Sequence, residues 1–579
     1  MRIQEPVINK ELVKQIKKEL KLNEDIISFL VGRGYDKDTI DLLTNNEYED
    51  MTDDYMLTNI KEVSDIVWDY LNNDTDIYIF NDYDSDGINA GYILYDCLSR
   101  LVLLQKSECK VNMHTPDRCE GYGLSMEFCK DLVINKNRDT LVITVDNGIT
   151  KKEECAYLKS NGIEVIITDH HKPQDEFIPE NTLIIDAHLY DTDNENALGL
   201  CGAAVAYKLC KYILKDKLND TEFHQIYIPY VAIATITDMM PITNENIIYV
   251  KNGLYLLNDE EYKSMFNTVD EETNILNYYN EFKGYKITPK DIAFEFGPQL
   301  NSCGRMGDVS KAMDLMLETD EDKIVDMYNE VCDINEQRKA LTNNAVEQIL
   351  ETVEDNPISV IRLVKNIQGV AGNVATHITN VKHVPTILFT DSNEEQITGS
   401  ARSIAGLDLQ YIFSTINTKL EMSFGGHELA AGVTIYKKDL NTFVELFNSV
   451  VLDMILSIQS SEEITEPIML VDKILSVKDL GDRIINKYDN ILYFNDLSEP
   501  IFCLKDVYIK DVRESKNNKN NIQFFFKDKT GENKKGIWCW KYGNSYKEAG
   551  SPTKVNLVFT LNKFNNMLCM DIKYMEPVD

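Results

Sequence analysis

Four short apolar runs in the first third of the chain each end in acidic residues or histidine. The runs DIYIF, LVITV, EVIIT and TLII are rich in valine and isoleucine, and stretches with helical spacing separate them. Such runs are typical of parallel strands that are buried on both faces of a sheet. Ligands of open α/β sheets bind beyond the carboxyl ends of the strands, so the side chains that follow the four runs are expected to meet in one crevice.

The residues that follow these runs predict a metal site. They are, in chain order, Asp82, Asp84, Asp86, Asp146, Asp169, His170, His171, Asp186 and His188. Asp238 follows a further apolar run, ATIT, and is expected at another strand-like end. Carboxylates this close together repel one another unless a cation binds between them. Oxygen ligands with one or two imidazoles suit Mn²⁺ or Mg²⁺, so the pattern indicates a metal-dependent phosphoesterase.

The pattern changes several times along the chain and divides it into five segments. Residues 1–70 are expected to form a helical lead-in, and residues 71–307 the α/β domain with the metal cluster. Residues 308–356 contain no glycine or proline and predict one connecting helix. A second, smaller α/β domain is expected at 357–457. Residues 462–579 contain short strands at a spacing of about ten residues, which predicts a small β-barrel or sandwich.

Composition narrows the cellular context. The 579 residues include twelve cysteines without a C-x-x-C pair, which fits reduced thiols in a cytosol rather than a zinc ribbon. No apolar run reaches the roughly 20 residues of a membrane span, and the first residues do not resemble a signal peptide, so a cytoplasmic protein is expected. The formal net charge of −36 argues against nonspecific adhesion to nucleic acid but leaves room for a local basic track.

Three polar motifs outside the cluster offer groups that bind anions. The segment GPQLNSCGR contains Asn301 and Arg305, and TGSARS contains Ser400 and Arg402. Hydroxyl and guanidinium groups of this kind suit phosphate. The loop with Gly425, Gly426 and His427 follows, and its glycines permit close backbone approach to a ligand. Each motif also has a plainer interpretation as an ordinary turn.

The predicted C-terminal barrel carries aromatic side chains between lysines. Half of the aromatics in a strand must face inward, so many of them belong to the core. Those that face outward beside lysines suit stacking on the bases of a single strand. The candidates are Trp538, Trp540, Lys527 and Lys529.

Taken together, these motifs resemble the DHH phosphoesterase superfamily and, within it, the RecJ single-strand exonucleases. The resemblance runs from about residue 75 to the C-terminus, with the motifs in the family's order. They are DYDSDG (82–87), PDRCEGYGL (116–124), VDNG (145–148), TDHH (168–171), GLCGAAVAYKL (199–209), ITDMMP (236–241), GPQLNSCGRMG (297–307), TGSARS (398–403) and GGHELAAG (425–432). One such motif is weak evidence, whereas the ordered series is very specific.

The resemblance implies a fold and a set of roles. The fold is a parallel-sheet DHH domain, a long connecting helix, a smaller α/β DHHA1 domain and a C-terminal OB-fold. Two ions, Mn²⁺ or Mg²⁺, would be held by Asp84, Asp86, Asp146, His170 and Asp238, with Asp146 bridging and Asp82 supporting the ligands from behind. His171 would face the scissile phosphate and Arg305 would stabilise it. The substrate and its 5′-phosphate would contact Arg118, Asn301, Ser400, Arg402, Gly425, Gly426 and His427.

The activity implied by the resemblance is 5′→3′ hydrolysis of single-stranded DNA to 5′-mononucleotides, in recombination, repair or replication. A monomer is expected, with a helicase or a single-strand-binding protein as a possible partner. Two alternatives stay open: a DHH phosphodiesterase for short oligonucleotides or cyclic dinucleotides, and a non-catalytic RecJ-related replication scaffold. The chain departs from the family pattern at Phe80, at Gln299 and at Asp186-Ala187-His188, which replaces the usual Asn-Pro.

Overall fold

The described chain forms two compact units, each built from segments that are far apart in the sequence. The computed structural model describes residues 2–45, 57–116, 123–215, 217–218, 220–259, 273–354, 357–461, 468–488, 491–516, 518–527, 533–564 and 567–578. The first unit comprises Met1–Asp53, Met239–Tyr255 and Glu466–Asp579. The second comprises Asp54–Asp238 and Leu256–Thr465.

A five-stranded parallel sheet forms the centre of the DHH domain in the second unit. Its strands, in spatial order, are β3 (Lys110–His114), β2 (Thr75–Asn81), β4 (Asp139–Val145), β5 (Glu164–Thr168) and β6 (Leu183–Ile185). The four predicted runs are β2, β4, β5 and β6, and β4 and β5 are buried along almost their whole length. Because all five strands are parallel, their carboxyl ends lie at one edge of the sheet.

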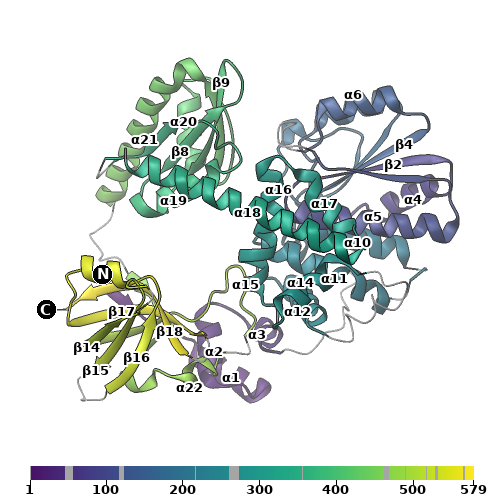
Figure 1. The fold of residues 1–579 in the computed structure, drawn as a ribbon. Helices are drawn as coiled ribbons and strands as arrows, with labels where there is room; N and C mark the ends of the chain where they lie inside the picture. Colours follow the sequence, from purple (N-terminus) through teal and green to yellow (C-terminus); the bar gives the residue numbers. More distant parts are fainter. Residues whose placement is uncertain are drawn as a thin grey trace. The chain divides into compact units, whose positions relative to one another are not determined.

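Helices cover both faces of this sheet. They are α4 (Ile60–Leu71), α5 (Ser85–Gln105), α6 (Met126–Asn135), α7 (Lys152–Ser160), α10 (Gly202–Leu214) and α11 (Asp220–Thr237). Cys129 of α6 and Leu158 of α7 pack against Val142 and Val165 on one face. Figure 1 shows α6 on one side of β2 and β4, with α4 and α5 on the other. Burial on both faces explains why these strands are continuously apolar.

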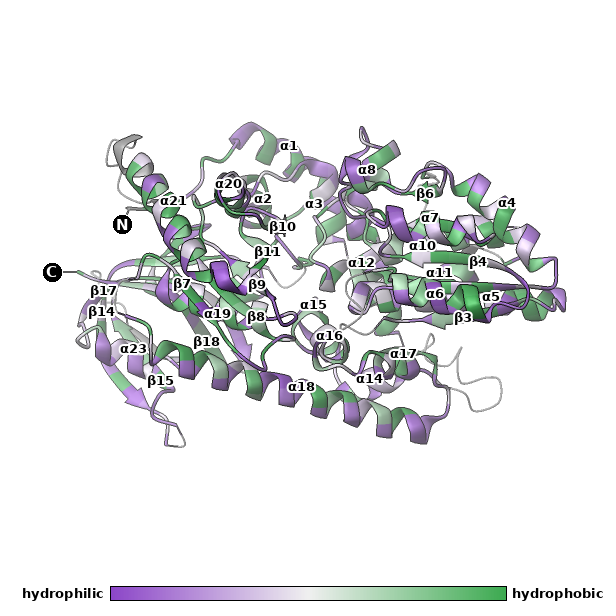
Figure 2. Ribbon diagram, turned by 90° about the horizontal axis from the view of Figure 1, so that it is seen from above, coloured by the Kyte–Doolittle hydropathy of each residue, from purple (hydrophilic) through white to green (hydrophobic). Residues whose placement is uncertain are grey.

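The connection between the two α/β domains is helical, but it is not the single helix predicted for 308–356. The structure has α16 (Gly297–Met306), α17 (Val309–Leu317) and the 30-residue α18 (Glu321–Leu350). Polar side chains interrupt the predicted helix, because Glu318 accepts from the backbone N–H of Thr319 and Asp320, and Asp320 caps α18. Figure 2 shows hydrophilic and hydrophobic residues alternating along α18.

The DHHA1 domain is a mixed sheet between two helical layers. Its strands, in spatial order, are β10 (Ser423–Gly426), β11 (Ala430–Tyr436), β9 (Gln396–Arg402), β8 (Thr386–Asp391) and β7 (Val360–Leu363). Leu388 faces α19 (Ala371–Lys382) and the end of α18, whereas Phe389 faces α20 (Leu409–Asn417) and α21 (Leu440–Ser461).

The helix α21 is the most apolar long helix of the described chain. Among the described residues, Lys437–Ser457 is the one helical stretch with the length and hydropathy of a membrane span. Phe443, Phe447 and Val451 of this stretch are buried in the DHHA1 core. Packing on the sheet covers this one face of the helix, whereas Leu452 and Leu456 are exposed.

A closed β-barrel forms most of the first unit, as expected for an OB-fold. Its strands are β13 (Lys473–Leu475), β14 (Phe502–Glu514), β15 (Ile522–Lys527), β16 (Asn533–Cys539), β17 (Lys554–Phe564) and β18 (Met567–Pro577). Pairing runs from β14 through β15, β16, β18 and β17, and β17 pairs with β14 again.

The N-terminal segment belongs to the barrel unit, which the sequence did not predict. Strand β1 (Arg2–Gln4) pairs in parallel with β12 (Ile468–Leu470). Helices α1 (Lys10–Leu20), α2 (Glu24–Gly32) and α3 (Lys37–Thr44) follow in the same unit. Arg33 forms two hydrogen bonds of 2.8 Å with the carboxylate of Asp472. The predicted lead-in of 1–70 is therefore divided, because α4 lies in the DHH domain.

Candidate metal centre and nucleic-acid contacts

The loop after β2 brings three aspartates to the edge of the sheet and starts α5. Asp84 is the N-cap residue and accepts from the backbone N–H of Asp86 and Gly87, both at 3.1 Å. Asp82 is buried and accepts from the N–H of Tyr83. A Cβ at Gly87 would lie 2.5 Å from the carbonyl oxygen of Asp82, so the loop requires glycine there. The motif thus combines a helix cap with carboxylates directed into the crevice.

Asp86 joins the starts of two helices. Its two carboxylate oxygens accept from the backbone N–H of Gly202 and Ala203, each at 2.7 Å, at the N-terminus of α10. Anions are favoured at helix N-termini, so α10 holds this carboxylate beside the cluster. A Cβ at Gly202 would lie 2.5 Å from the Cβ of Asp146, which explains the glycine in GLCGAA.

Asp146 lies at the centre of the cluster. It follows β4 with a φ of 62°, and its N–H donates to the carbonyl of Thr168 at the end of β5. Its Oδ1 is buried without a hydrogen-bond donor among the described residues and lies 3.1 Å from Nε2 of His170. A buried carboxylate oxygen in this state has the character of an unfilled ligand position.

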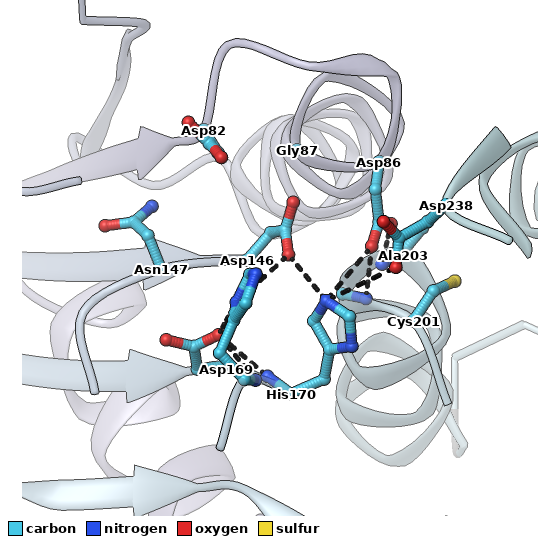
Figure 3. Close-up of polar contacts among 12 residues, drawn as sticks. Asp82, Asp86, Gly87, Asp146, Asn147, Asp169, His170, Cys201, Ala203 and Asp238 are labelled. Carbon is cyan, nitrogen blue, oxygen red and sulfur yellow. Dashed lines mark hydrogen bonds and ion pairs between the residues drawn. The ribbon is translucent and has the colours of Figure 1, made fainter. Parts of the chain in front are cut away.

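The histidine pair after β5 is divided between two directions. Asp169 accepts from the backbone N–H of both histidines and lies 2.8 Å from Nδ1 of His171. His170 is hydrogen bonded to the backbone of Leu200, and its Nε2 faces the carboxylates. Figure 3 shows the His170 ring directed between Asp146 on one side and Asp86 and Asp238 on the other. A hydrogen bond that orients the ring of a ligating histidine is a common support for metal sites.

Asp238 reaches the cluster from the end of a helix, so the prediction that it follows a strand is wrong. The run ATIT is the last turn of α11, and the N–H of Asp238 donates to the carbonyl of Ala234. Its Oδ2 lies 3.7 Å from Nε2 of His170. Four-residue apolar runs do not distinguish strand from helix, which explains the error.

The electrostatics of the cluster fit a divalent cation. Burial, and then the neighbouring carboxylates, raise the pKa of Asp86 to about 7 and that of Asp238 to about 8. The same causes raise the pKa of Asp82 and Asp146 well above the usual range. Burial lowers the pKa of His170 to about 3, so its ring is neutral. Neutral imidazole and carboxylate are the ligand forms that metals require, and a cation would offset the crowded negative charge.

Three overlapping groups of side chains have the spacing of metal ligands. Within each group, the potential ligand atoms lie within 4.8 Å of one another. The groups are Asp146, His170 and His171; Asp86, His170 and Asp238; and Asp82, Asp84 and Asp146. The structure thus brings together all five predicted ligands, and it also places Asp82 among the potential ligands rather than behind them.

His171 differs from its neighbour in charge. Burial opposes its protonation, but the hydrogen bond with Asp169 and the nearby carboxylates raise its pKa to about 9. Its side chain is about half exposed, at 45%, whereas that of His170 is 11% exposed. The exposed histidine is therefore the one that an incoming ligand can contact.

The three departures from the family pattern have structural explanations. Phe80 is buried against the rings of His114 and Phe128, at centroid distances of 5.2 and 5.0 Å. Gln299 is buried and contacts α18 through Tyr328 and Cys332. His188 lies over Asp186, with Nδ1 3.7 Å from its Oδ1, near the cluster but in none of the three groups.

Helix α16 is attached directly to the aspartate loop. Oδ1 of Asn301 accepts from the N–H of Ser85 at 2.6 Å. A Cβ at Gly304 would lie 2.8 Å from the Tyr83 ring, so glycine permits the close approach of α16. Arg305 lies on the last turn of this helix. The sequence predicted substrate contact for Asn301, whereas in the structure its side chain positions the loop.

The DHHA1 sheet gathers most of the predicted phosphate-binding residues. Ser400, Gly432 and Gly425 lie opposite one another on β9, β11 and β10. Gly426 has a φ of 135°, and a Cβ there would lie 2.5 Å from the carbonyl of Ala430. His427 follows in the exposed turn. Arg118 lies outside the described residues.

Arg402 lies at the start of α19. A Cβ at Gly372 would lie 2.9 Å from a terminal nitrogen of its guanidinium, so the arginine passes over the first turn of this helix. Burial lowers its pKa. Its Nη1 donates to the carbonyl of Ala401 at 2.8 Å. Among the described residues it forms no ion pair within 4 Å, and an anion is a suitable partner for it.

The barrel presents two parallel tryptophan rings. Trp538 and Trp540 are stacked with an interplanar angle of 6° and a centroid distance of 5.5 Å, and Trp540 is 39% exposed. Phe524 and Phe526 are buried in the core, as half of the aromatics were expected to be. Lys527 is exposed on β15, and Lys529 lies outside the described residues.

Several positioning residues were missed from the sequence. Leu200, Gly202 and Ala203 act through backbone groups, and Gly304 acts through its missing side chain. The motif GLCGAAVAYKL contained the signal, because small residues at the start of a helix permit close contact with a neighbouring strand end. Its interpretation requires the knowledge that α10 begins beside Asp86.

Comparison with known proteins agrees with this architecture. Residues 76–235 match the DHH family, N-terminal domain, residues 355–453 the DHHA1 domain, and residues 471–569 the RecJ OB domain. The single-stranded-DNA-specific exonuclease RecJ of Bacillus subtilis is 26% identical over 97% of this chain and 69% of its own length. RecJ of Haemophilus influenzae is 26% identical over 87% of this chain and 88% of its own length.

Solved RecJ structures share the fold. The Mn²⁺ complex of RecJ from Thermus thermophilus covers 100% of this chain with a TM-score of 0.77 and 21% identity, over 79% of its own chain. A structure of exonuclease RecJ bound to manganese covers 69% of this chain with a TM-score of 0.57 and 26% identity, over 96% of its own chain. The expected combination of DHH domain, DHHA1 domain and OB-fold is confirmed, and the chain is similar to RecJ proteins over this whole arrangement.

Proposed function

We propose that this protein is a metal-dependent exonuclease that hydrolyses single-stranded DNA from the 5′ end to 5′-mononucleotides. The observation that supports this most is the intact acid and imidazole cluster around the buried Asp146, in a chain that also carries a RecJ OB domain. A relative named single-stranded-DNA-specific exonuclease aligns with 97% of this chain. A scaffold without activity would not need to maintain so many buried carboxylates.

Two Mn²⁺ or Mg²⁺ ions fit the cluster. Asp84, Asp86, Asp146, His170 and Asp238 would hold them, and Asp82 offers a further oxygen. RecJ structures contain Mn²⁺ in one case and Mg²⁺ in another, which supports the choice of ion. When bound, such ions lower the pKa of a water molecule and neutralise charge on phosphate oxygens.

The protein's own groups orient the reaction. Leu200 orients the ring of His170, and Asp169 orients that of His171, so both imidazoles are fixed before substrate binds. His171 faces the opening of the cluster and is proposed to contact the scissile phosphate. Arg305, on the helix that Asn301 fixes to the aspartate loop, is proposed to stabilise the developing charge.

The polarity of hydrolysis is proposed to come from the DHHA1 sheet. Ser400 and Arg402 lie on β9, beside the glycines of β10 and β11, and offer hydroxyl and guanidinium groups to a terminal 5′-phosphate. Arg118 is proposed to complete this pocket. The stacked Trp538 and Trp540 would bind bases further along the strand.

The decisive test is degradation of a 5′-phosphorylated single-stranded DNA of about 50 nucleotides, several times the site size of one OB-fold. The unmodified chain is compared with Asp146→Ala in Mn²⁺. Asp131→Ala, an exposed aspartate on α6, is the matched control. Mononucleotides released from the 5′ end by the unmodified chain and the control, but not by Asp146→Ala, would support the proposal.

Parallel substrates separate the alternatives. A complementary strand or a blocked 5′ end should prevent degradation. Cleavage restricted to di- to pentanucleotides would favour the phosphodiesterase for short substrates, and binding without cleavage would favour the scaffold. The proposal also includes action as a monomer in the cytoplasm, with a helicase or single-strand-binding protein supplying the unpaired strand. Size-exclusion chromatography with and without DNA tests the oligomeric state.

A further inference from the structure

A polar cavity that is open to solvent lies between α18 and α19, outside the metal cluster, and most of the side chains that line it are exposed. It has a volume of about 380 Å³. It is lined on α18 by Arg338, Lys339 and Asn343 and on α19 by Asn373, Thr376 and His377. No acidic residue is among the described residues that line it. The ammonium of Lys339 forms an ion pair with Glu336 at 2.7 Å, so the groups on offer in this chain of net charge −36 are a guanidinium, amides and an imidazole.

Arg338 is the most constrained cation in this cavity. Its Nε donates to Oδ1 of Asn335 at 3.0 Å, and no carboxylate lies within 4 Å of it among the described residues. Its side chain is partly buried, and that burial lowers its pKa. A partly buried guanidinium that lines a cavity and has no carboxylate within 4 Å favours an anionic ligand.

The two helices hold the walls of the cavity in place. Ala345 and Ile349 of α18 pack with Val374, Ala375 and Ile378 of α19 in one buried cluster. Thr342 is also buried, and its hydroxyl donates to the carbonyl of Arg338. The cavity is therefore built on two packed helices rather than on loops, which gives its polar groups fixed positions.

The short segment that leads into α19 lies close to two further arginines before it reaches the cavity. A Cβ at Gly369 would overlap the carbonyl oxygen of Arg305, and Gly372 contacts the guanidinium of Arg402. Asn373, the next residue, lines the cavity with Arg338. The first turn of α19 begins at Val370, whose side chain cannot cap its N–H groups. Anions are favoured at such a helix start, and the guanidinium of Arg402 lies beside it.

We propose that the cavity between α18 and α19 is a further phosphate-binding site, with Arg338 as its central ligand. This inference rests on the proposed function in one respect, because it takes the phosphate to belong to nucleic acid or to a nucleotide released from nucleic acid. A metal ion is a poor alternative because the lining has no carboxylate. A base alone is also a poor alternative because the lining offers no aromatic ring other than that of His377.

The test measures binding rather than cleavage. Fluorescence anisotropy with a labelled single strand of about 50 nucleotides is performed on the full chain carrying Asp146→Ala, with and without Arg338→Ala. We expect Arg338→Ala to weaken binding on the order of tenfold. We also expect the slope of log K against log salt to become shallower by about 0.7, the value for one phosphate contact on a single strand.

Matched variants separate phosphate contact from misfolding. Arg338→Lys keeps the charge and should keep the salt slope while it loses part of the affinity. Asn373→Ala, on the other wall, should weaken binding without a change in slope. Arg362→Ala removes an exposed arginine from β7 of the same domain and should change neither quantity. Unchanged thermal unfolding of each variant shows that the fold is intact.

A second arm identifies the source of the phosphate. Thymidine 5′-monophosphate is titrated calorimetrically into the same proteins. If Arg338→Ala binds both the nucleotide and the strand more weakly, the cavity binds free nucleotides as well as the strand. If it binds only the strand more weakly, the cavity binds the phosphate backbone of the strand. Equal binding of both ligands by Arg338→Ala and the parent overturns the inference. If no variant binds the strand at all, the proposed function fails, and the nucleotide titration alone decides the role of the cavity.

Discussion

Asp86→Asn provides a test that separates the two tasks of the aspartate loop. In the structure Asp86 accepts from two backbone N–H groups of α10 and also faces His170 and Asp238. The substitution keeps the size of the side chain. It replaces one acceptor oxygen with an NH₂ group, so one of the two buried N–H groups loses its partner.

The magnitude follows from that lost contact. A hydrogen bond to a charged group contributes about 1.5–3 kcal/mol, and a buried donor left without a partner costs a similar amount. For a domain of this size each kcal/mol corresponds to roughly 2–4 °C in the unfolding temperature. The metal-free Asp86→Asn protein is therefore expected to unfold about 3–12 °C lower than a variant that loses a cluster carboxylate without this contact.

The assay is differential scanning fluorimetry of EDTA-treated protein at pH 8, followed by addition of Mn²⁺. This pH lies above the pKa of about 7 that burial gives Asp86, so the carboxylate form dominates. At a metal concentration 100 times Kd, binding stabilises the unmodified protein by about 2.7 kcal/mol. Asp86→Asn should lose most of this stabilisation by Mn²⁺, in addition to its lower unfolding temperature without metal.

Asp238→Asn is the matched control. Asp238 has no hydrogen bond from a backbone N–H to its carboxylate among the described contacts, and its side chain is 32% exposed. This variant should lose the Mn²⁺ gain but keep the metal-free unfolding temperature, or even raise it, because one of several crowded carboxylates is neutralised. Asp86→Asn gives the same relief of charge, so the difference between the two variants reports the contact with α10. A metal-free Asp86→Asn protein as stable as Asp238→Asn would refute the reasoning about α10.

Four further predictions concern the barrel unit and the requirement for metal. Arg33→Ala leaves the carboxylate of Asp472, 9% exposed, without its partner and should destabilise the barrel unit by about 3–5 kcal/mol, measured by urea unfolding. Trp540→Ala should weaken single-strand binding by about 1–3 kcal/mol in anisotropy measurements, while cleavage of a dinucleotide stays unchanged. Chelation by EDTA should abolish nuclease activity, and Mn²⁺ should restore it; activity that persists after dialysis would contradict the metal proposal. Burial opposes the charge on Asp25, but hydrogen bonds with two lysines lower its pKa. The stabilising effect of its carboxylate should therefore be full above pH 3.8 and be lost below it. Urea unfolding across pH 3–7 should show the free-energy difference between the unmodified protein and Asp25→Asn decreasing as the pH falls below 3.8.

The sequence predicted the metal edge of the sheet because local patterns sufficed there. Each of the runs before Asp82, Asp146 and Asp169 is a strand buried on both faces, so hydrophobicity alone located the ends where ligands gather. The edge strand β3 escaped prediction because its residues are only partly buried and alternate with polar ones. Asp238 was assigned to the cluster correctly in space but to the wrong element, because its apolar run is too short to reveal a helix.

The remaining features depend on contacts between distant residues. Arg33 and Asp472 are separated by 439 positions, and no local pattern links them. The amides of Gly202 and Ala203 bind Asp86 through the backbone, so their residue types carry little information about the contact. The break between α17 and α18 depends on Glu318 and Asp320 acting as caps, which a count of glycine and proline does not register.

The pairing of β1 with β12 sets an order of events during synthesis. Residues 2–45 are synthesised well before the strand and the barrel that they pack against, which are made only after residue 466. At 5–20 residues per second, completion of the barrel follows roughly 30–110 seconds later. The DHH and DHHA1 domains can fold during that interval. The apolar faces of the N-terminal helices stay exposed to solvent until the barrel has formed. This segment is therefore the part of the chain where chaperone binding during translation is expected.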